Sequence, residues 1–233
     1  MKSPFILIKE SFAQYFSNIA LYGGIYLLPT IGSYLLVFNV EDGQELALGT
    51  SVAFAVVSVI LIVLNVYAAI ALVKAVNDPT MTIMASFKQS YGFFWKYVLL
   101  SLLLGFMTLL GLLLLVVPGI MIMIYTSLAY IVLVLEDKGP IASCKQSYHY
   151  IKGQWWAVAW RLLVFVGFSF VYAFAFSLAV SLLSTVIMPL IAVSLIYLMN
   201  LILVPVSVIY LYRLYQEVKQ MPSEAPVASE ITI

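Results

Sequence analysis

The sequence has little charge and few residues of the kinds that bind metals or form disulfides. Charged residues make up 9% of its 233 residues, against about 25% in soluble globular proteins. The net charge of +1 excludes a strongly basic surface of the kind that binds nucleic acid. A single cysteine, Cys144, excludes an intramolecular disulfide, and with the single histidine, His149, it forms no redox pair or metal-ligand cluster. We therefore expect no nucleic-acid partner, no metal and no cofactor.

Patterns typical of catalysis are also missing. The sequence has no glycine-rich phosphate-binding loop and no metal-ligand spacing. Cys144 and His149 are five residues apart and fall on different faces of one predicted helix, which is poor geometry for a nucleophile and its base. The pair Glu136-Asp137 stands at the end of an apolar run, where it caps or solvates a loop. We therefore expect no catalytic residue and no enzymatic activity.

Apolar sequence, in contrast, is abundant, with hydrophobic residues making up 64% of the chain. Four stretches of 30, 28, 39 and 51 residues carry no charged side chain: Ser11–Val40, Leu46–Val73, Tyr97–Leu135 and Leu162–Tyr212. A helix needs roughly 20 apolar residues to cross a membrane, and a charge at its centre costs about 2.5 to 3.5 kcal/mol. The sequence therefore predicts an all-α integral membrane protein.

The two longest stretches can each cross the membrane twice. Pro118-Gly119, in the middle of the third stretch, predicts a hairpin turn, because proline ends a helix and glycine lets the chain reverse. The fourth stretch divides at Leu183-Ser184-Thr185, shortly before Pro189. The prediction is six transmembrane helices, at Asn18–Phe38, Gly49–Val73, Tyr97–Val117, Ile120–Leu135, Leu162–Leu182 and Val186–Tyr212.

The distribution of charge favours six spans over four. Six spans place all eleven lysine and arginine residues on one side of the membrane. With four spans, these residues would move to the other side: Lys138, Lys145, Lys152 and Arg161. Short cytoplasmic loops carry an excess of lysine and arginine, so we expect three hairpins with both termini inside. The charged residues of the outer loops are then all acidic: Glu41, Asp42 and Glu45.

An internal repeat is visible on the predicted inner side. The segments Ser86–Tyr91 and Ser143–Tyr148 differ at one position in six, and a weaker copy occupies Ser11–Phe16. Each copy precedes an odd-numbered span, which predicts units of a surface helix followed by a transmembrane hairpin. We expect one transmembrane domain, 1–220, with units 1–75, 76–137 and 138–217. The remaining residues, 221–233, are expected to form a disordered cytoplasmic tail.

The surface helices are predicted to be amphipathic. In the third unit the apolar positions recur at steps of three and four: Ile141, Cys144, Tyr148, Ile151 and Trp155. In the first unit the same face is formed by Phe5, Ile8, Phe12 and Tyr15. Such helices lie at the membrane surface, so the candidate lipid-headgroup contacts are Lys88, Lys145, Lys152, Trp95 and Trp155. The alternative is that these segments are the helical starts of the spans that follow them.

Few polar residues interrupt the spans. No ionisable side chain lies in the middle of a span, whereas proton relays and ion-coupled transporters usually place one there. Asn65 and Asn200 lie deep in the second and sixth spans, and Pro29 and Pro205 predict kinks in the first and sixth. One interpretation is hydrogen bonding and packing between helices. The other is a polar interior formed by these four residues that receives a headgroup or a solute.

A further pattern runs through Leu115–Ile120, Val134–Gly139, Ala142-Ser143, Trp155-Trp156 and Ile209–Tyr215. In these residues the chain resembles the YciC-like inner-membrane proteins of bacteria and the related membrane domain that accompanies some glycerophosphodiester phosphodiesterases. The resemblance implies a six-span helical protein of the bacterial cytoplasmic membrane. It carries over no catalytic residue, because the phosphodiesterase barrel with its carboxylates and histidines has no counterpart in this chain.

Three functions follow from these observations as hypotheses. The favoured one is a non-enzymatic multi-pass protein of the bacterial inner membrane that handles lipid or another apolar molecule, or supports membrane homeostasis. The alternatives are a transporter or channel for a small solute, and a scaffold that binds protein partners through the surface helices. The expected partners are membrane lipids, with a second copy of the chain or another membrane protein as a further possibility.

The sole native thiol provides a test of the predicted orientation. Cys144 is expected on the cytoplasmic side, so it should resist a membrane-impermeant maleimide in intact cells and react once the membranes are opened. Rapid labelling of Cys144 in intact cells would place the basic end of the protein outside and contradict the topology.

Overall fold

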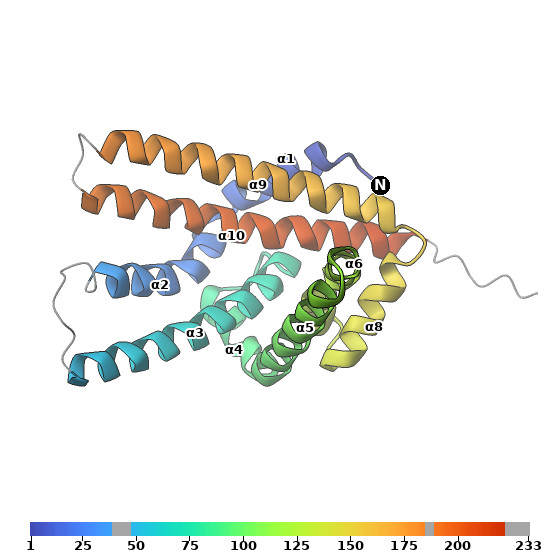
Figure 1. Cartoon of the computed structure of the whole chain (residues 1–233), viewed down its shortest axis with the longest axis horizontal. Coiled ribbons are helices and arrows are strands. Elements are labelled where there is room, and N and C mark those ends of the chain that lie inside the picture. Colours follow the sequence, from blue (N-terminus) through green and yellow to red (C-terminus); the bar gives the residue numbers. More distant parts are fainter. Residues whose placement is uncertain (39–47, 185–188, 222–233) are drawn as a thin grey trace, which may run out of the picture.

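The computed structural model describes residues 1–38, 48–184 and 189–221, and all regular structure in this part of the chain is helical (Figure 1). Six helical segments are long and apolar enough to cross a membrane: Ile19–Leu36, Val52–Asn77, Ile83–Leu113, Val116–Leu135, Trp155–Leu182 and Ser194–Gln220. An all-helical protein with six such segments is confirmed. The acidic outer loop lies outside the described residues, and so does the predicted tail apart from Met221.

The long helices are α2 (Ile19–Phe38), α3 (Leu48–Asn77), α5 (Phe94–Leu114), α9 (Trp155–Ser184) and α10 (Pro189–Gln220). The fourth apolar segment consists of α6 (Val116–Thr126) and α7 (Ala129–Leu135). Shorter helices precede two of the apolar segments, at α1 (Pro4–Ser17) and α8 (Pro140–Ile151), and a third, α4 (Ile83–Ser90), forms the start of the segment Ile83–Leu113. A single 3₁₀ turn, η1 (Tyr91–Phe93), joins α4 to α5.

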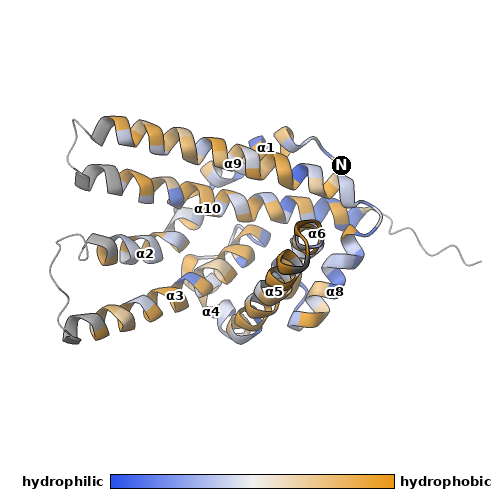
Figure 2. Cartoon of the chain, in the orientation of Figure 1, coloured by the Kyte–Doolittle hydropathy of each residue, from blue (hydrophilic) through white to orange (hydrophobic). Residues whose placement is uncertain are grey.

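The central helix of the fold is α10, which contacts α1, α2, α3, α7, α8 and α9. In Figure 1 four helix ends lie at the left: the C-terminal ends of α2 and α9 and the N-terminal ends of α3 and α10. The N-terminus of the chain and the C-terminal end of α10 lie at the right. The α5–α6 pair runs obliquely to these four helices. Figure 2 shows hydrophilic residues mostly toward the right-hand end, which therefore corresponds to the basic side of the sequence pattern.

Close packing is concentrated toward the same end. Three alanines of α3, Ala68, Ala71 and Ala75, are fully buried at steps of three and four, and they allow neighbouring helices to approach closely. They share one core with α2 residues such as Tyr22 and α10 residues such as Ile209. The N-terminal half of α3 is different, because large side chains such as Val52 and Ile62 are exposed there.

The helix break between α5 and α6 differs from the prediction. The break is at Leu115, whose backbone is extended (φ −165°, ψ 143°), and Pro118 and Gly119 lie within α6. Proline is tolerated there because the first N–H groups of a helix have no partner in that helix. A Cβ atom on Gly119 would lie 2.9 Å from the backbone nitrogen of Leu112. The predicted hairpin turn at Pro118-Gly119 was therefore wrong: the proline starts a helix and the glycine allows two helices to touch.

The fourth apolar segment is also interrupted, at Ser127 and Leu128. A break in a helix frees the carbonyl that the next turn would have bonded, and such a group is costly when it is left unpaired away from water. The carbonyl of Tyr125 lies at this break and accepts a hydrogen bond of 2.7 Å from the hydroxyl of Ser147 in α8. The short helix α8 therefore completes the interrupted segment.

The short helices bury serines as well as part of their predicted apolar faces. Serine residues of the repeated segments are fully buried: Ser11, Ser86, Ser90, Ser143 and Ser147. Apart from Ser147, each hydroxyl donates to the carbonyl four residues earlier in its own helix or helix cap. Because serine is small and its hydroxyl is satisfied locally, this face packs closely without an unpaired polar group. Within the predicted apolar faces, Ile8, Tyr15 and Ile151 are buried, whereas Phe5 and Ile141 are 70% and 64% exposed.

The proline inside α10 is compensated by α1. Pro205 has no N–H, so the Leu201 carbonyl four residues earlier has no helical donor. The hydroxyl of Tyr15 in α1 donates to that carbonyl at 3.2 Å, and Tyr15 is 1% exposed. The short N-terminal helix is thereby joined to the central helix at its weakest backbone position.

This contact predicts a coupled effect on stability. Tyr15→Phe leaves the Leu201 carbonyl unpaired and should lower the free energy of unfolding in detergent by about 1 to 2 kcal/mol. In a Pro205→Ala background the restored N–H can donate to the same carbonyl, so Tyr15→Phe should cost much less, as a double-mutant cycle would measure. Tyr91→Phe, at a position 67% exposed, is the matched control and should be nearly neutral. Equal costs of Tyr15→Phe in both backgrounds would refute the compensation.

Candidate functional site

A partly buried carboxylate joins three helices at the basic end of the molecule. Glu136, directly after α7, accepts hydrogen bonds from Tyr150 of α8 at 2.6 Å and from Tyr215 of α10 at 2.8 Å. Its oxygens also pair with the Nζ atoms of Lys138 at 2.9 Å and Lys219 at 3.1 Å. The side chain of Glu136 is only 13% exposed. This arrangement fastens α7, α8 and α10 together.

The partners of Glu136 keep it ionised. Desolvation acts to raise its pKa, but the hydrogen bonds from Tyr150, Lys138, Tyr215 and Lys219 together outweigh this and lower the pKa to about 2. Burial, followed by the hydrogen bond to Glu136, raises the pKa of Tyr150 to about 12. The tyrosine therefore remains the proton donor and the carboxylate the acceptor at any physiological pH. Their role is structural cohesion, since neither group changes its charge near neutral pH.

A second polar cluster fastens α1 to α10. The guanidinium of Arg213 donates to Glu10 at 2.5 Å and to the side-chain oxygen of Gln14 at 2.8 Å. Lys2 pairs with the other oxygen of Glu10 at 2.6 Å. The hydrogen bond from Lys2 is the main reason that the pKa of Glu10 lies below its ordinary value. Lys2 and Arg213 are therefore used in contacts within the protein, whereas Lys9 is exposed and has no carboxylate partner among the described residues.

Arg161, in α9, holds the N-terminus in place. It is 9% exposed, and its Nε and Nη2 atoms donate to the backbone carbonyl of Lys2 at 3.0 and 2.6 Å. The Arg161 carbonyl in turn accepts a hydrogen bond from Tyr210 of α10 at 2.8 Å. The sequence identified Arg161 only as a basic residue beside a span. Because Arg161 lies within the first turns of a long apolar helix, the sequence could have indicated that its side chain is buried.

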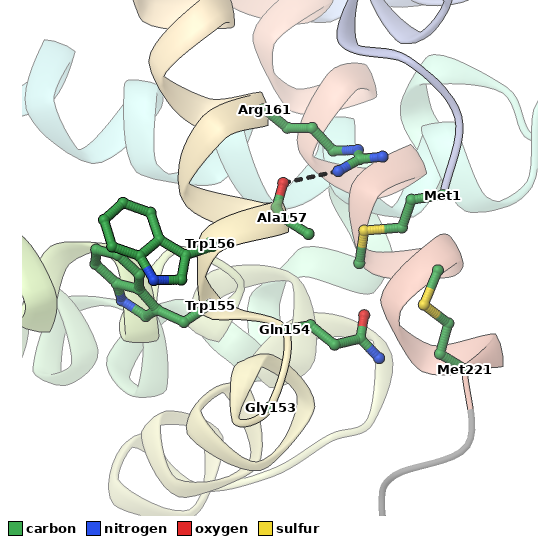
Figure 3. A pocket seen from close by; sticks show the side chains of 8 residues that line it. All are labelled: Met1, Gly153, Gln154, Trp155, Trp156, Ala157, Arg161 and Met221. Atoms are coloured by element: carbon green, nitrogen blue, oxygen red, sulfur yellow. Dashed lines mark hydrogen bonds between the residues drawn. The ribbon is translucent and has the colours of Figure 1, made fainter.

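Arg161 also lines a pocket of about 700 Å³ at this end of the molecule (Figure 3). In Figure 3 the indole rings of Trp155 and Trp156 lie together on one side of the pocket, and Met1 and Met221 lie on the other. The two indole rings are perpendicular, with centroids 4.7 Å apart. The buried Nε1 of Trp155 has no hydrogen-bond partner among the described residues.

The five candidate headgroup contacts are distributed over the surface of the molecule. Lys88 of α4, Lys145 of α8 and Lys152 after α8 are all exposed. Within the described part of the chain, none of these three lysines has a carboxylate partner. Trp95 of α5 is 72% exposed, whereas Trp155 is only partly exposed. The structure therefore does not gather these residues into one site, but it leaves the three lysines available to an external anion.

The expected polar interior is not formed. Asn65 and Asn200 are exposed on the outside of the chain, and each donates to the carbonyl four residues earlier in its own helix, at 2.9 and 3.0 Å. An amide deep in a span can satisfy itself in this way, so it needs no partner on another helix. Pro29 and Pro205 are buried inside α2 and α10 and contribute to helix packing. The sequence missed the residues that do carry the polar contacts, such as Tyr15 and Glu136.

Two apolar pockets open on the sides of the helices. One, of about 360 Å³, lies between α5, α6 and α8. The other, of about 210 Å³, lies between α2 and α10 and includes Thr30, Tyr34 and Tyr197. The described residues contain no group of three or more histidine, cysteine, aspartate or glutamate side chains that could hold a metal ion.

Comparison with known proteins gives one match. The model of an uncharacterised protein family, UPF0259, matches residues 35–217. No curated protein and no solved structure matches the chain. The family match fits the expected YciC-like resemblance, while the relation to the membrane domain of glycerophosphodiester phosphodiesterases stays a prediction.

The Glu136 contacts predict how stability depends on pH. A carboxyl whose pKa is depressed on folding stabilises the protein above its ordinary pKa of 4.5, and this stabilisation is lost as the pH falls toward about 2. Glu136→Gln should therefore lower the free energy of unfolding at neutral pH by roughly 2 kcal/mol and flatten its pH dependence between 5 and 2. Unfolding in detergent across this range measures both effects.

The neighbouring Asp137→Asn is the matched control, because the Asp137 side chain is 69% exposed. It should change the pH dependence much less than Glu136→Gln. If both variants behave alike, the Glu136 contacts do not fasten the helices.

Proposed function

The chain belongs to the uncharacterised protein family UPF0259, and we propose that it is a non-enzymatic membrane protein that handles lipid or another apolar molecule at the basic face of the membrane. The observation that carries this proposal is the division of its cations into two sets. Five cations are paired with carboxylates of the chain: Lys2, Lys96, Lys138, Arg213 and Lys219. Four lysines are exposed and have no such partner in the described chain, so an external anion can bind them: Lys9, Lys88, Lys145 and Lys152.

The proposed orientation places this basic end in the cytoplasm of a bacterium, with the protein in the inner membrane. Lysine and arginine beside the spans favour the cytoplasmic side. The spans are then three hairpins with both termini inside, and α1, α4 and α8 lie at the inner surface. The lysines of α4 and α8 would meet the negatively charged lipids of the cytoplasmic leaflet, where each basic residue contributes about 1 kcal/mol.

The proposal also includes the threefold internal repeat. Support comes from the corresponding serines of the repeated segments, Ser86 and Ser143, which are both fully buried within short helices that precede an apolar helix. Three helices of this kind, spaced along the chain, would give the protein several contacts with the inner leaflet. Simultaneous contacts strengthen one another because the first brings the others close to the membrane surface.

The alternatives have less support. A solute transporter that uses Asn65 and Asn200 would need these amides in an interior, but both are exposed. The apolar pockets between α5, α6 and α8 and between α2 and α10 suit a hydrocarbon chain better than a polar solute. A scaffold role would use the same exposed surfaces of α4 and α8. Native mass spectrometry distinguishes these roles, because retained lipid supports the proposal and a retained protein supports the scaffold.

Three of the unpaired lysines, Lys88, Lys145 and Lys152, provide the test. In vesicles that contain brominated phosphatidylglycerol or brominated phosphatidylcholine, quenching of tryptophan fluorescence measures which lipid lies beside the basic end. The variant Lys88→Glu, Lys145→Glu, Lys152→Glu should lose roughly tenfold or more in its preference for the anionic lipid. The matched variant with arginine at the same three positions keeps the charge and should keep the preference. An unchanged preference in the glutamate variant would refute the proposal.

A further inference from the structure

The pocket between α5, α6 and α8 is lined mostly by apolar surface, to which Met107 of α5 and Ile122 of α6 contribute. Lys145 and His149, one helical turn apart on α8, are also among its lining residues, and the Lys145 side chain carries a positive charge. The remaining lining residues are Tyr125, Thr126, Cys144 and Tyr148. This combination matches an amphipathic ligand that has a hydrocarbon chain and an anionic group.

The polar atoms at the rim are available to such a ligand. Lys145 has no carboxylate partner in the part of the chain that the structure describes. The Tyr125 and Tyr148 rings lie 4.8 Å apart, and neither hydroxyl has a hydrogen-bond partner among the described residues. An ammonium group and two phenol hydroxyls are suitable donors for phosphate oxygens. The hydroxyl of Thr126, in contrast, is occupied by the carbonyl of Ile122 at 2.7 Å.

The size and position of the pocket limit the occupant further. Its volume of about 360 Å³ is near the lower end of the roughly 300 to 1,000 Å³ typical of small-molecule pockets. It therefore fits one hydrocarbon chain and not a whole phospholipid. Because α5 and α6 are apolar membrane helices with exposed side chains, the pocket opens toward lipid. The molecules present there at high concentration are the lipids of the bilayer.

We infer that this pocket binds one acyl chain of an anionic phospholipid from the surrounding leaflet, with its phosphate at Lys145, His149 and the hydroxyls of Tyr125 and Tyr148. This inference rests on the proposed function and gives it a specific site. The helix break at Ser127 and Leu128 contributes to the site, because Ser147 bonds the Tyr125 carbonyl and so fixes α8 beside α6. The site is thereby formed by the same contact that completes the interrupted segment.

The sole cysteine lies in this pocket and reports on its occupancy. In vesicles of phosphatidylcholine, Cys144 should react with N-ethylmaleimide at a basal rate. In vesicles that also contain phosphatidylglycerol, the reaction should be about tenfold slower, the factor expected when nine sites in ten are occupied. Equal rates in the two kinds of vesicle would overturn the inference.

Two kinds of variant locate the effect in the pocket. Met107→Trp fills the apolar part of the pocket and should abolish the difference between the two vesicles, whereas Phe106→Trp, at a position 62% exposed on the same helix, should preserve it. Lys145→Gln with His149→Gln should also abolish the difference, and Lys96→Gln, outside the pocket and paired with Asp137, should preserve it. Loss of the difference in Phe106→Trp and Lys96→Gln as well would show that the protection does not come from this pocket.

The outcome separates the inference from the proposed function. If Met107→Trp keeps the tryptophan-quenching preference for anionic lipid and loses protection of Cys144, both stand. If Cys144 is never protected while the quenching preference is present, the pocket is not a lipid site and the surface contacts remain. If neither effect occurs, the proposed function fails together with the site.

Discussion

The fold depends on one constraint: a polar group that faces hydrocarbon must find its partner within the protein, because the membrane interior offers none. The constraint is most severe where a helix is interrupted. Pro205 leaves the Leu201 carbonyl free, and Tyr15 bonds it. The break after α6 leaves the Tyr125 carbonyl, and Ser147 bonds it. Both donors come from short helices at the basic end, so the interruptions determine where α1 and α8 attach to the spans.

The same constraint governs the charged residues. Arg161 enters the bundle with its guanidinium bonded to the backbone carbonyls of Lys2 and Ala157. Glu136 is only 13% exposed, and hydroxyl and ammonium donors surround it. These contacts join the N-terminal segment to α9, and α7 to α8 and α10. A cation that takes part in such a contact is less available to an external anion, whereas Lys9 and the exposed lysines of α4 and α8 have no carboxylate partner among the described residues.

The coarse architecture could be predicted from the sequence, whereas the contacts could not. Charge-free stretches locate apolar helices because a charge in a membrane is costly, and the six segments agree with that expectation. The break at Leu115 could not be located, since Pro118 is as well suited to starting a helix as to ending one. The buried serine faces were missed because periodicity counts serine as polar, although Ser143 satisfies its own hydroxyl within α8. The interpretation of Asn65 as part of a polar interior failed for the same reason, because its side-chain amide donates a hydrogen bond to a carbonyl of its own helix.

The position of small residues explains why the helices pack closely at the basic end and leave large side chains exposed along their sides. Apolar burial gives little drive for association between helices in lipid, so packing depends on how closely the backbones can approach. Ala68, Ala71 and Ala75 permit close approach toward the basic end of α3. Toward the other end, large side chains such as Val52 and Ile62 are exposed instead. Under the proposed function, a bundle that packs closely at its basic end and leaves its flanks open would admit hydrocarbon chains from the side without exposing them to water.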